Sequence, residues 1–226
     1  MLGDKFEVKP YDYGPGKKIL DELISRIKSK KTPLSIGIGG ESGCGKSTQA
    51  QALKTLLDIR GYHTIVLRMD DYFLLPPRTN HNNRLKDINA VGPGEVNLDE
   101  LNENIKFIEN KDSDLLVKPL INYDLNVIRK EYVEIQEVRA VIVEGTYVLL
   151  LENLNIRIFM PQNYMQTKRK RRERGRDEIS SFNERVLMIE HEIIRKHHRV
   201  ANYIIDSEYN IIKSKPVTSP GPHLRI

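Results

Sequence analysis

Several features are scarce in this sequence, and each scarcity excludes a class of protein. Cys44 is the only cysteine among 226 residues, which excludes an internal disulfide framework and suits a reducing compartment. No apolar run is long enough to cross a bilayer, because even "VIVEGTYVLLL" is interrupted by Glu144. The first ten residues contain no apolar signal region, and we find no internal repeat. We therefore expect a cytoplasmic protein with no membrane partner.

The composition is that of a globular protein with a local excess of positive charge. Hydrophobic residues make up 39% of the chain and charged residues 30%, with a net charge of +5. This length predicts one domain, residues 1–226, with one sizeable core. We expect a helical extension over residues 1–33 and a loosely held tail over residues 213–226. Much of the excess charge lies in "TKRKRRERGRDE", residues 167–178.

Apolar periodicity predicts alternating strands and helices. Buried strands are expected at residues 34–40, 63–69, 138–145, 155–160 and 201–207, and helices at residues 17–30, 47–61, 98–110, 163–174 and 180–198. Residues 122–136 alternate like an antiparallel hairpin with a turn near residues 124–126. Residues 75–94 show little periodicity and are expected to form a long functional loop. The pattern predicts a three-layer α/β fold, with a mostly parallel sheet covered by helices on both faces.

The stretch "GGESGCGKST" contains the phosphate-binding loop pattern Gly40-x-x-x-x-Gly45-Lys46-Ser47. Such a loop directs successive backbone N–H groups at phosphate oxygens, so the sequence predicts an ATP site. Lys46 would reach the β- and γ-phosphates, and the Ser47 hydroxyl would bind Mg²⁺. The expected nucleotide-binding residues of the loop are Gly40, Glu41, Ser42, Gly43, Cys44, Gly45, Lys46, Ser47 and Thr48. A strand before the loop and a helix after it are the context that this mechanism requires, so we expect the three-layer α/β fold to be of the P-loop NTPase type.

Carboxylates follow two of the predicted strands. Asp70 and Asp71 come directly after one strand, and Glu144 follows "AVIV" of another. Phosphoryl transfer to an alcohol needs a carboxylate near Mg²⁺ and one that accepts the hydroxyl proton. A single acidic residue at a strand end is more often a helix cap or a surface charge. Two such sites beside a P-loop favour the catalytic interpretation.

The basic run has three interpretations. A helix over residues 163–174 would place Arg169 and Arg172 on one face, with Arg176 beyond Gly175, as in a lid that closes over phosphates. A solvated helix face and a nucleic-acid or targeting segment are the alternatives. Tyr164 is the only aromatic residue nearby and acidic residues interrupt the run, so we expect a lid over residues 163–178 and no nucleic-acid partner.

Five motifs in order resemble one family of P-loop kinases. "IGIGGESGCGKST", "DDYF", "KPLINYD", "VIVEGTYVLL" and "ERGRD" are similar to motifs of the uridine kinase and phosphoribulokinase family, over about residues 34–206. The resemblance implies that Asp70 is the general base and lies near Mg²⁺, with Asp71 only its neighbour. It also implies that Glu144 lies near Mg²⁺, that Arg174 and Arg176 are lid arginines, and that Tyr123 lies beside the base of a nucleoside acceptor.

The chain departs from uridine kinases at the acceptor side. The Asp and His of their ribose-binding element are replaced by Val91 and Gly92, and the position that reads the pyrimidine falls near Ile128, followed by Arg129. The segment "NYMQTKRKRR" resembles the nicotinamide riboside kinase branch. We expect an enzyme that uses ATP and Mg²⁺ to phosphorylate a hydroxyl of a nucleoside of the uridine or cytidine type. One alternative is a kinase of nicotinamide riboside or of a sugar phosphate, and Arg129 and Arg84 would favour an anionic acceptor. The other is a non-catalytic nucleotide-binding switch or RNA-binding protein.

Three weaker features complete the expectations. Cys44 fills a variable position of the loop, so alkylation is expected to block activity for steric reasons only. His197 and His198 end a helix and are expected to be surface residues. A small-molecule substrate is the expected partner, and association with further copies of the chain is left open.

Overall fold

A six-stranded sheet forms the centre of the molecule, and its strand order is β2-β5-β1-β6-β7-β8. The computed structural model describes residues 7–174 and 180–217, with the side chain of Arg174 left out. The strands are β1 Leu34–Gly40, β2 Thr64–Arg68, β5 Ala140–Gly145, β6 Ile156–Met160, β7 Tyr203–Ile205 and β8 Ile211–Lys213. All adjacent pairs are parallel except β7 with β8. The expectation of a mostly parallel sheet is confirmed.

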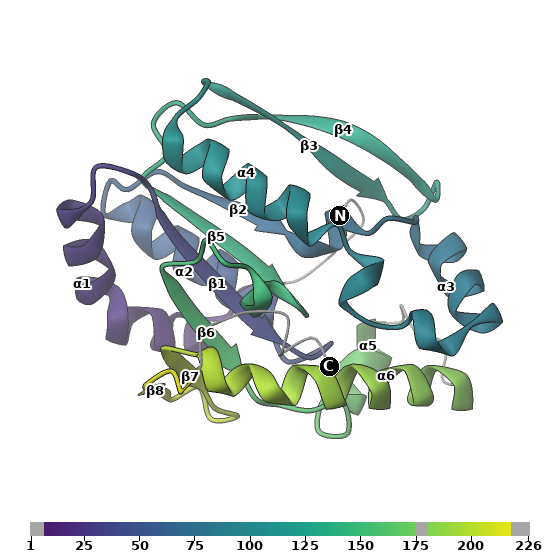
Figure 1. Ribbon diagram of the computed structural model, residues 1–226. Helices are drawn as coiled ribbons and strands as arrows, with labels where there is room; N and C mark the ends of the chain where they lie inside the picture. Colours follow the sequence, from purple (N-terminus) through teal and green to yellow (C-terminus); the bar gives the residue numbers. More distant parts are fainter. Residues whose placement is uncertain (1–6, 175–179, 218–226) are drawn as a thin grey trace.

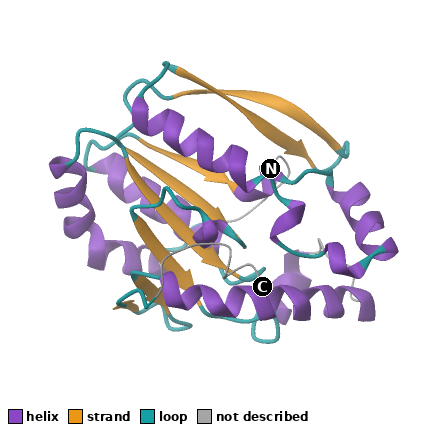
Figure 2. Ribbon diagram, in the orientation of Figure 1, coloured by secondary structure: helices purple, strands orange, loops and turns teal. Residues whose placement is uncertain are grey.

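Helices cover both faces of this sheet, which gives three layers (Figure 1). α1 Tyr13–Ser29 and α2 Lys46–Ile59 pack on one face, and α4 Leu98–Asn110 and α6 Ser181–Ile194 lie on the other (Figure 2). Alternate residues of β5 divide between two hydrophobic clusters, since Ile142 packs with α1 and α2 while Val141 and Val143 pack toward α4. Burial of both strand faces explains why the strands are apolar throughout.

The central position of β1 brings three strand ends to the same edge. β1 pairs with β5 on one side and with β6 on the other, and β2 pairs with β5. The carboxyl ends of β1, β2 and β5 are therefore neighbours, and loops that follow these strands meet there. The P-loop follows β1 and the "DDYF" element follows β2, while Glu144 is the second-last residue of β5.

A separate two-stranded sheet extends one side of the molecule. β3 Leu115–Asn122 and β4 Val127–Glu134 form an antiparallel hairpin beside α4. The predicted turn is confirmed, but the first strand begins at Leu115, upstream of residue 122. Its alternation was hidden because Lys118 is buried within the strand and Pro119 follows it, a residue type that argues against a strand interior.

The expected long loop over residues 75–94 is wrong, because most of it is helical. α3 Pro77–Lys86 begins with proline at its first turn, where a missing N–H costs nothing. Only Asn80 of this helix is buried, so no apolar stripe revealed it in the sequence. Polar contacts hold the helix in place instead. Asn80 and Arg84 both donate to the buried Glu95 carboxylate.

Short 3₁₀ segments complete the described chain: η1 Pro10–Asp12, η2 Met69–Tyr72, η3 Ile88–Ala90, η4 Pro93–Glu95, η5 Val148–Leu150 and η6 Arg195–Val200. Two expectations for the C-terminal part are corrected. The final strand is β8, which pairs with β7 and occupies the start of the predicted tail; residues 218–226 lie outside the described residues. His197 is fully buried in η6 rather than exposed, and burial lowers its pKa to about 3. No helix in the described ranges is long and apolar enough to cross a membrane.

Candidate active site

The loop between β1 and α2 has the backbone that phosphate binding requires. Gly43 and Gly45 have φ values of 80° and 101°, a region that side chains with a Cβ rarely adopt. These turns bring the loop around to the N-terminus of α2, where free N–H groups favour an anion. Lys46 lies inside the curve, and its Nζ donates to the Glu41 carbonyl oxygen at 2.9 Å. A cationic side chain and backbone N–H groups thus surround one point, which suits a phosphate chain.

A pair of carboxylates lies next to this loop. The Ser47 hydroxyl donates to Glu144 Oε1 at 3.0 Å, which links the first turn of α2 to the carboxyl end of β5. Burial raises the pKa of Glu144, and the negative charge of Asp70 raises it further. The Asp70 carboxylate therefore lies close enough to Glu144 for its charge to act there. Two carboxylates and one hydroxyl supply oxygen atoms, which are the ligands that Mg²⁺ prefers.

These oxygen donors therefore suit a Mg²⁺ ion that takes only some of its ligands from the protein. No group of three acidic, histidine or cysteine side chains that could hold a metal occurs in the part of the chain that the structure describes. Phosphate oxygens and water would supply the remaining ligands, as is usual for Mg²⁺ at nucleotide sites. The ion would also favour the charged form of Glu144 and so oppose the increase in its pKa.

The two adjacent aspartates of "DDYF" have different surroundings. Asp71 is 2% exposed and accepts hydrogen bonds from the Ile121 N–H at 3.2 Å and from Lys118 Nζ at 3.4 Å. These contacts attach η2 to β3. Asp70 is half-buried and its charge acts on Glu144. Asp71 is thus held by β3, and the division of roles between Asp70 and Asp71 stays a prediction.

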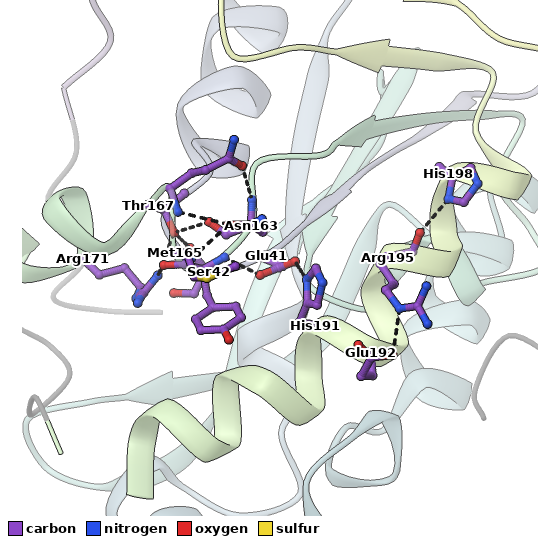
Figure 3. A network of polar contacts seen from close by, with 12 residues as sticks. Glu41, Ser42, Asn163, Met165, Thr167, Arg171, His191, Glu192, Arg195 and His198 are labelled. Carbon is purple, nitrogen blue, oxygen red and sulfur yellow. Dashed lines mark hydrogen bonds and ion pairs between the residues drawn. The ribbon is translucent and has the colours of Figure 1, made fainter. Parts of the chain in front are cut away.

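Glu41 joins the P-loop to two later segments of the chain (Figure 3). Its Oε2 accepts the Tyr164 N–H at 2.6 Å, and its Oε1 lies 2.6 Å from Nδ1 of His191 in α6. Glu41 is 5% exposed, so this contact is largely shielded from solvent. Any movement of the segment after β6 would therefore have to break contacts to the phosphate loop itself.

The basic helix α5 Lys168–Arg174 contacts the P-loop through one arginine that the sequence did not single out. Arg171 is 8% exposed and donates to the Tyr164 carbonyl and to the Thr167 hydroxyl, and Thr167 in turn donates to the Ser42 carbonyl (Figure 3). A Cβ on Gly43 would lie 2.9 Å from Arg171 Cγ, so glycine permits this approach. The only signal in the sequence is the spacing of Thr167 and Arg171, one helical turn apart.

For the other arginines of the lid, the predicted roles stay predictions. The helix begins at residue 168, five residues later than expected, and Arg171 rather than the pair Arg169 and Arg172 faces the loop. Arg169 is exposed, and its Nε lies 3.7 Å from Glu173. The Arg174 side chain and Arg176 lie outside the described residues.

The acceptor side of the sheet edge is bordered by α3 and the hairpin turn (Figure 1). Arg78 donates to the Asp124 carbonyl at 2.8 Å, which ties α3 to the turn next to Tyr123. Tyr123 is half-buried and Arg129 is exposed on β4, so both stay predicted substrate residues. The Arg84 guanidinium binds the Glu95 carboxylate with two nitrogens, at 2.5 and 2.8 Å. It also lies 3.2 Å from Glu190.

A cavity of about 440 Å³ lies beside the P-loop. Gly43, Gly45 and residues 46–48 form its inner wall, and Lys170 and Glu173 of α5 line it as well. The rest of the lining comes from distant parts of the chain: Glu7, Tyr11, Asp12 and Tyr209. None of these four was predicted, because each is remote from the loop in sequence and belongs to no motif.

The expectation that alkylation of Cys44 blocks activity is corrected by its position. The side chain is fully buried in the core, and burial raises the pKa of the thiol. Only the thiolate reacts with iodoacetamide, so we expect native protein at pH 8 to be labelled at least about 100-fold more slowly than urea-unfolded protein. Mass spectrometry of timed samples measures both rates. Equal rates in the two states would contradict the buried position.

Comparison with known proteins agrees with this geometry. A profile of the "Phosphoribulokinase / Uridine kinase family" matches residues 35–177, well over half of the chain. No curated protein sequence matches. Among solved structures, the chain is similar to D-glycerate 3-kinase from Cryptococcus neoformans, with a TM-score of 0.57, 13% identity, and 92% of this chain and 99% of that chain covered.

Two further structures share the fold. Phosphoribulokinase from Rhodobacter spheroides has a TM-score of 0.58 at 12% identity, with 85% of this chain and 76% of that chain covered. A protein described as "a Possible Uridine Kinase from Bacillus stearothermophilus" has a TM-score of 0.52 at 19% identity, with 83% and 97% covered. At these identities the likeness shows the α/β fold, and their printed names differ in the acceptor.

Proposed function

The chain belongs to the phosphoribulokinase and uridine kinase family, and from that premise we propose that it transfers the γ-phosphoryl group of ATP, with Mg²⁺, to a hydroxyl of an uncharged small metabolite, a nucleoside first. The enzyme is a kinase that acts on hydroxyl groups. One observation carries the proposal most directly. The Ser47 hydroxyl bonds Glu144 at 3.0 Å beside the P-loop, with the charge of Asp70 acting on the same carboxylate.

The proposed role of each residue follows from its position in the site. The loop N–H groups and Lys46 bind the phosphate chain and stabilise the charge that develops on it. Asp70 is proposed to accept the proton of the acceptor hydroxyl. Ser47, Glu144 and Asp70 would hold Mg²⁺, which when bound neutralises phosphate charge. Arg169, Arg174 and Arg176 are proposed to reach the phosphates from the lid, and Arg171 holds that helix against the loop.

The charges near the acceptor side support an uncharged acceptor. Arg84 is shared by two carboxylates, Glu95 and Glu190, so this region carries no surplus positive charge from Arg84. Lys118 is similarly held between Asp71 and Glu131, with its Nζ 2.6 Å from Glu131 Oε2. A phosphorylated sugar bound through Arg84 or Lys118 would have to displace these pairs, and breaking a buried ion pair is costly. A nucleoside hydroxyl would not, and Tyr123 is proposed to lie beside its base.

An acceptor panel tests this proposal. ADP formation from Mg²⁺-ATP would be followed with uridine, cytidine, nicotinamide riboside, ribulose 5-phosphate and glycerate at equal concentrations. We expect kcat/KM for the best nucleoside to exceed that for either anionic compound at least about tenfold, since one unpaired charge at a desolvated site costs that much or more. A clear preference for ribulose 5-phosphate would reject the proposal of an uncharged acceptor. It would make Arg129 the candidate anion-binding residue.

A further inference from the structure

The cavity beside the P-loop begins next to the carboxylates, because Ser47, whose hydroxyl donates to Glu144 at 3.0 Å, is part of its lining. The lining also includes the loop at Gly43 and Gly45 and the first turn of α2 through Thr48, and it continues to Tyr11 and Tyr209. The reacting end of the phosphate chain must lie near Asp70 and Glu144. A nucleotide bound to the loop therefore extends its other end, the nucleoside, away from these carboxylates along the cavity. A volume of about 440 Å³ is within the usual range for small-molecule sites.

The outer wall of this cavity comes from segments that the family profile does not match. The profile covers residues 35–177, whereas Tyr11 and Asp12 belong to η1 and Tyr209 lies in the turn between β7 and β8. The tertiary structure brings these two ends of the chain together. The rings of Tyr11 and Tyr209 lie 5.3 Å apart at an interplanar angle of 66°. The motifs common to the family therefore do not specify this wall.

The two rings differ in how they are held. Tyr11 lines the cavity and is 55% exposed. Tyr209 is half-buried, and its hydroxyl lies 3.9 Å from the point where a Cβ on Gly45 would be. Burial and the neighbouring Asp12 carboxylate raise the pKa of Tyr209 to about 12, so its ring stays neutral. One fixed ring near the loop and one exposed ring could contact a flat aromatic group between the phosphates and solvent.

We propose that Tyr11 and Tyr209 form the nucleobase subsite of the ATP site and favour a purine over a pyrimidine. The proposal rests on the proposed function, because it assumes that the P-loop holds the phosphates of a nucleoside triphosphate. Contact with an aromatic ring stabilises any base, and it is stronger for the larger purine ring system. The N-terminal segment before α1 is thereby part of the substrate site.

Calorimetric titration of the full chain with two ligands tests the subsite. ATP contains base and phosphates, whereas inorganic tripolyphosphate contains the phosphates alone. In the wild type we expect ATP to bind at least about tenfold more tightly than tripolyphosphate. Tyr11→Ala should weaken ATP about tenfold, the usual effect of removing one stacking partner, and leave tripolyphosphate unchanged. It should also reduce the preference for ATP over CTP.

Two further variants control for other effects. Tyr132→Ala removes a tyrosine that is 64% exposed on β4, and we expect both affinities to stay at wild-type values. Tyr209→Phe keeps the ring and loses only the hydroxyl, so ATP should weaken less than threefold, whereas Tyr209→Leu should weaken ATP about tenfold.

Each outcome decides the proposal. Wild-type affinities for ATP and tripolyphosphate that are equal would reject the subsite and leave the phosphoryl-transfer proposal standing. A Tyr11→Ala protein that binds ATP normally, or that loses both ligands equally, would also reject it. Failure of the wild type to bind either ligand would reject the proposed function together with the subsite.

Discussion

Asp70→Asn should lower kcat by roughly 10² to 10⁴ while leaving ATP affinity nearly unchanged. Asparagine keeps the size of the side chain and one oxygen, but it cannot accept the proton of the acceptor hydroxyl. The transition state of phosphoryl transfer needs little prior ionisation of that hydroxyl, so part of the rate enhancement should remain. Single-turnover rates at saturating ATP and acceptor measure the effect, with calorimetry to follow ATP binding.

Asp71→Asn is the matched control, because the residue is adjacent and chemically identical. Its carboxylate faces Lys118 and the Ile121 N–H instead of Glu144. We expect a stability loss of about 1–3 kcal/mol in urea unfolding, from a buried charge pair made incomplete, and a much smaller change in kcat. If Asp71→Asn abolished turnover while Asp70→Asn retained it, the roles assigned within "DDYF" would be reversed.

Lys46→Ala should reduce kcat by about 10² to 10³, the usual loss when one preorganised donor to a developing charge is removed. Alanine leaves the charge between the β- and γ-phosphates without its cation. The fold should survive, because the Glu41 carbonyl that Lys46 contacts also accepts the Cys44 N–H at 3.3 Å. Steady-state kinetics with the preferred acceptor and a thermal unfolding midpoint measure the two properties.

Lys106→Ala is the charge control for this experiment, since it removes a lysine exposed on α4 and should behave as wild type. Turnover by Lys46→Ala within a factor of two of the wild type would remove the P-loop from the proposed mechanism.

The local parts of the site could be predicted because each depends on residues close together in the chain. The P-loop conformation follows from glycines spaced within one turn, and the adjoining strand and helix are specified by apolar runs that need burial. Glu144 could be placed near the loop because strand ends meet at one edge of a parallel sheet. The same argument placed Asp70 there, but it could not separate Asp70 from Asp71, since both follow β2.

Contacts between distant segments were decided by the tertiary structure alone. Apart from its spacing from Thr167, nothing in the sequence indicates that Arg171, among six lysine and arginine residues of α5, packs on Gly43. The helix α3 has no apolar stripe and is held by the distant Glu95, so periodicity could not reveal it. Tyr11 and Tyr209 lie almost two hundred residues apart and meet only because α1 packs on the sheet face to which β7 contributes Tyr203 and Ile205. Local patterns determine which elements form and where strand ends carry chemistry, whereas long-range packing determines which side chains surround a bound nucleotide.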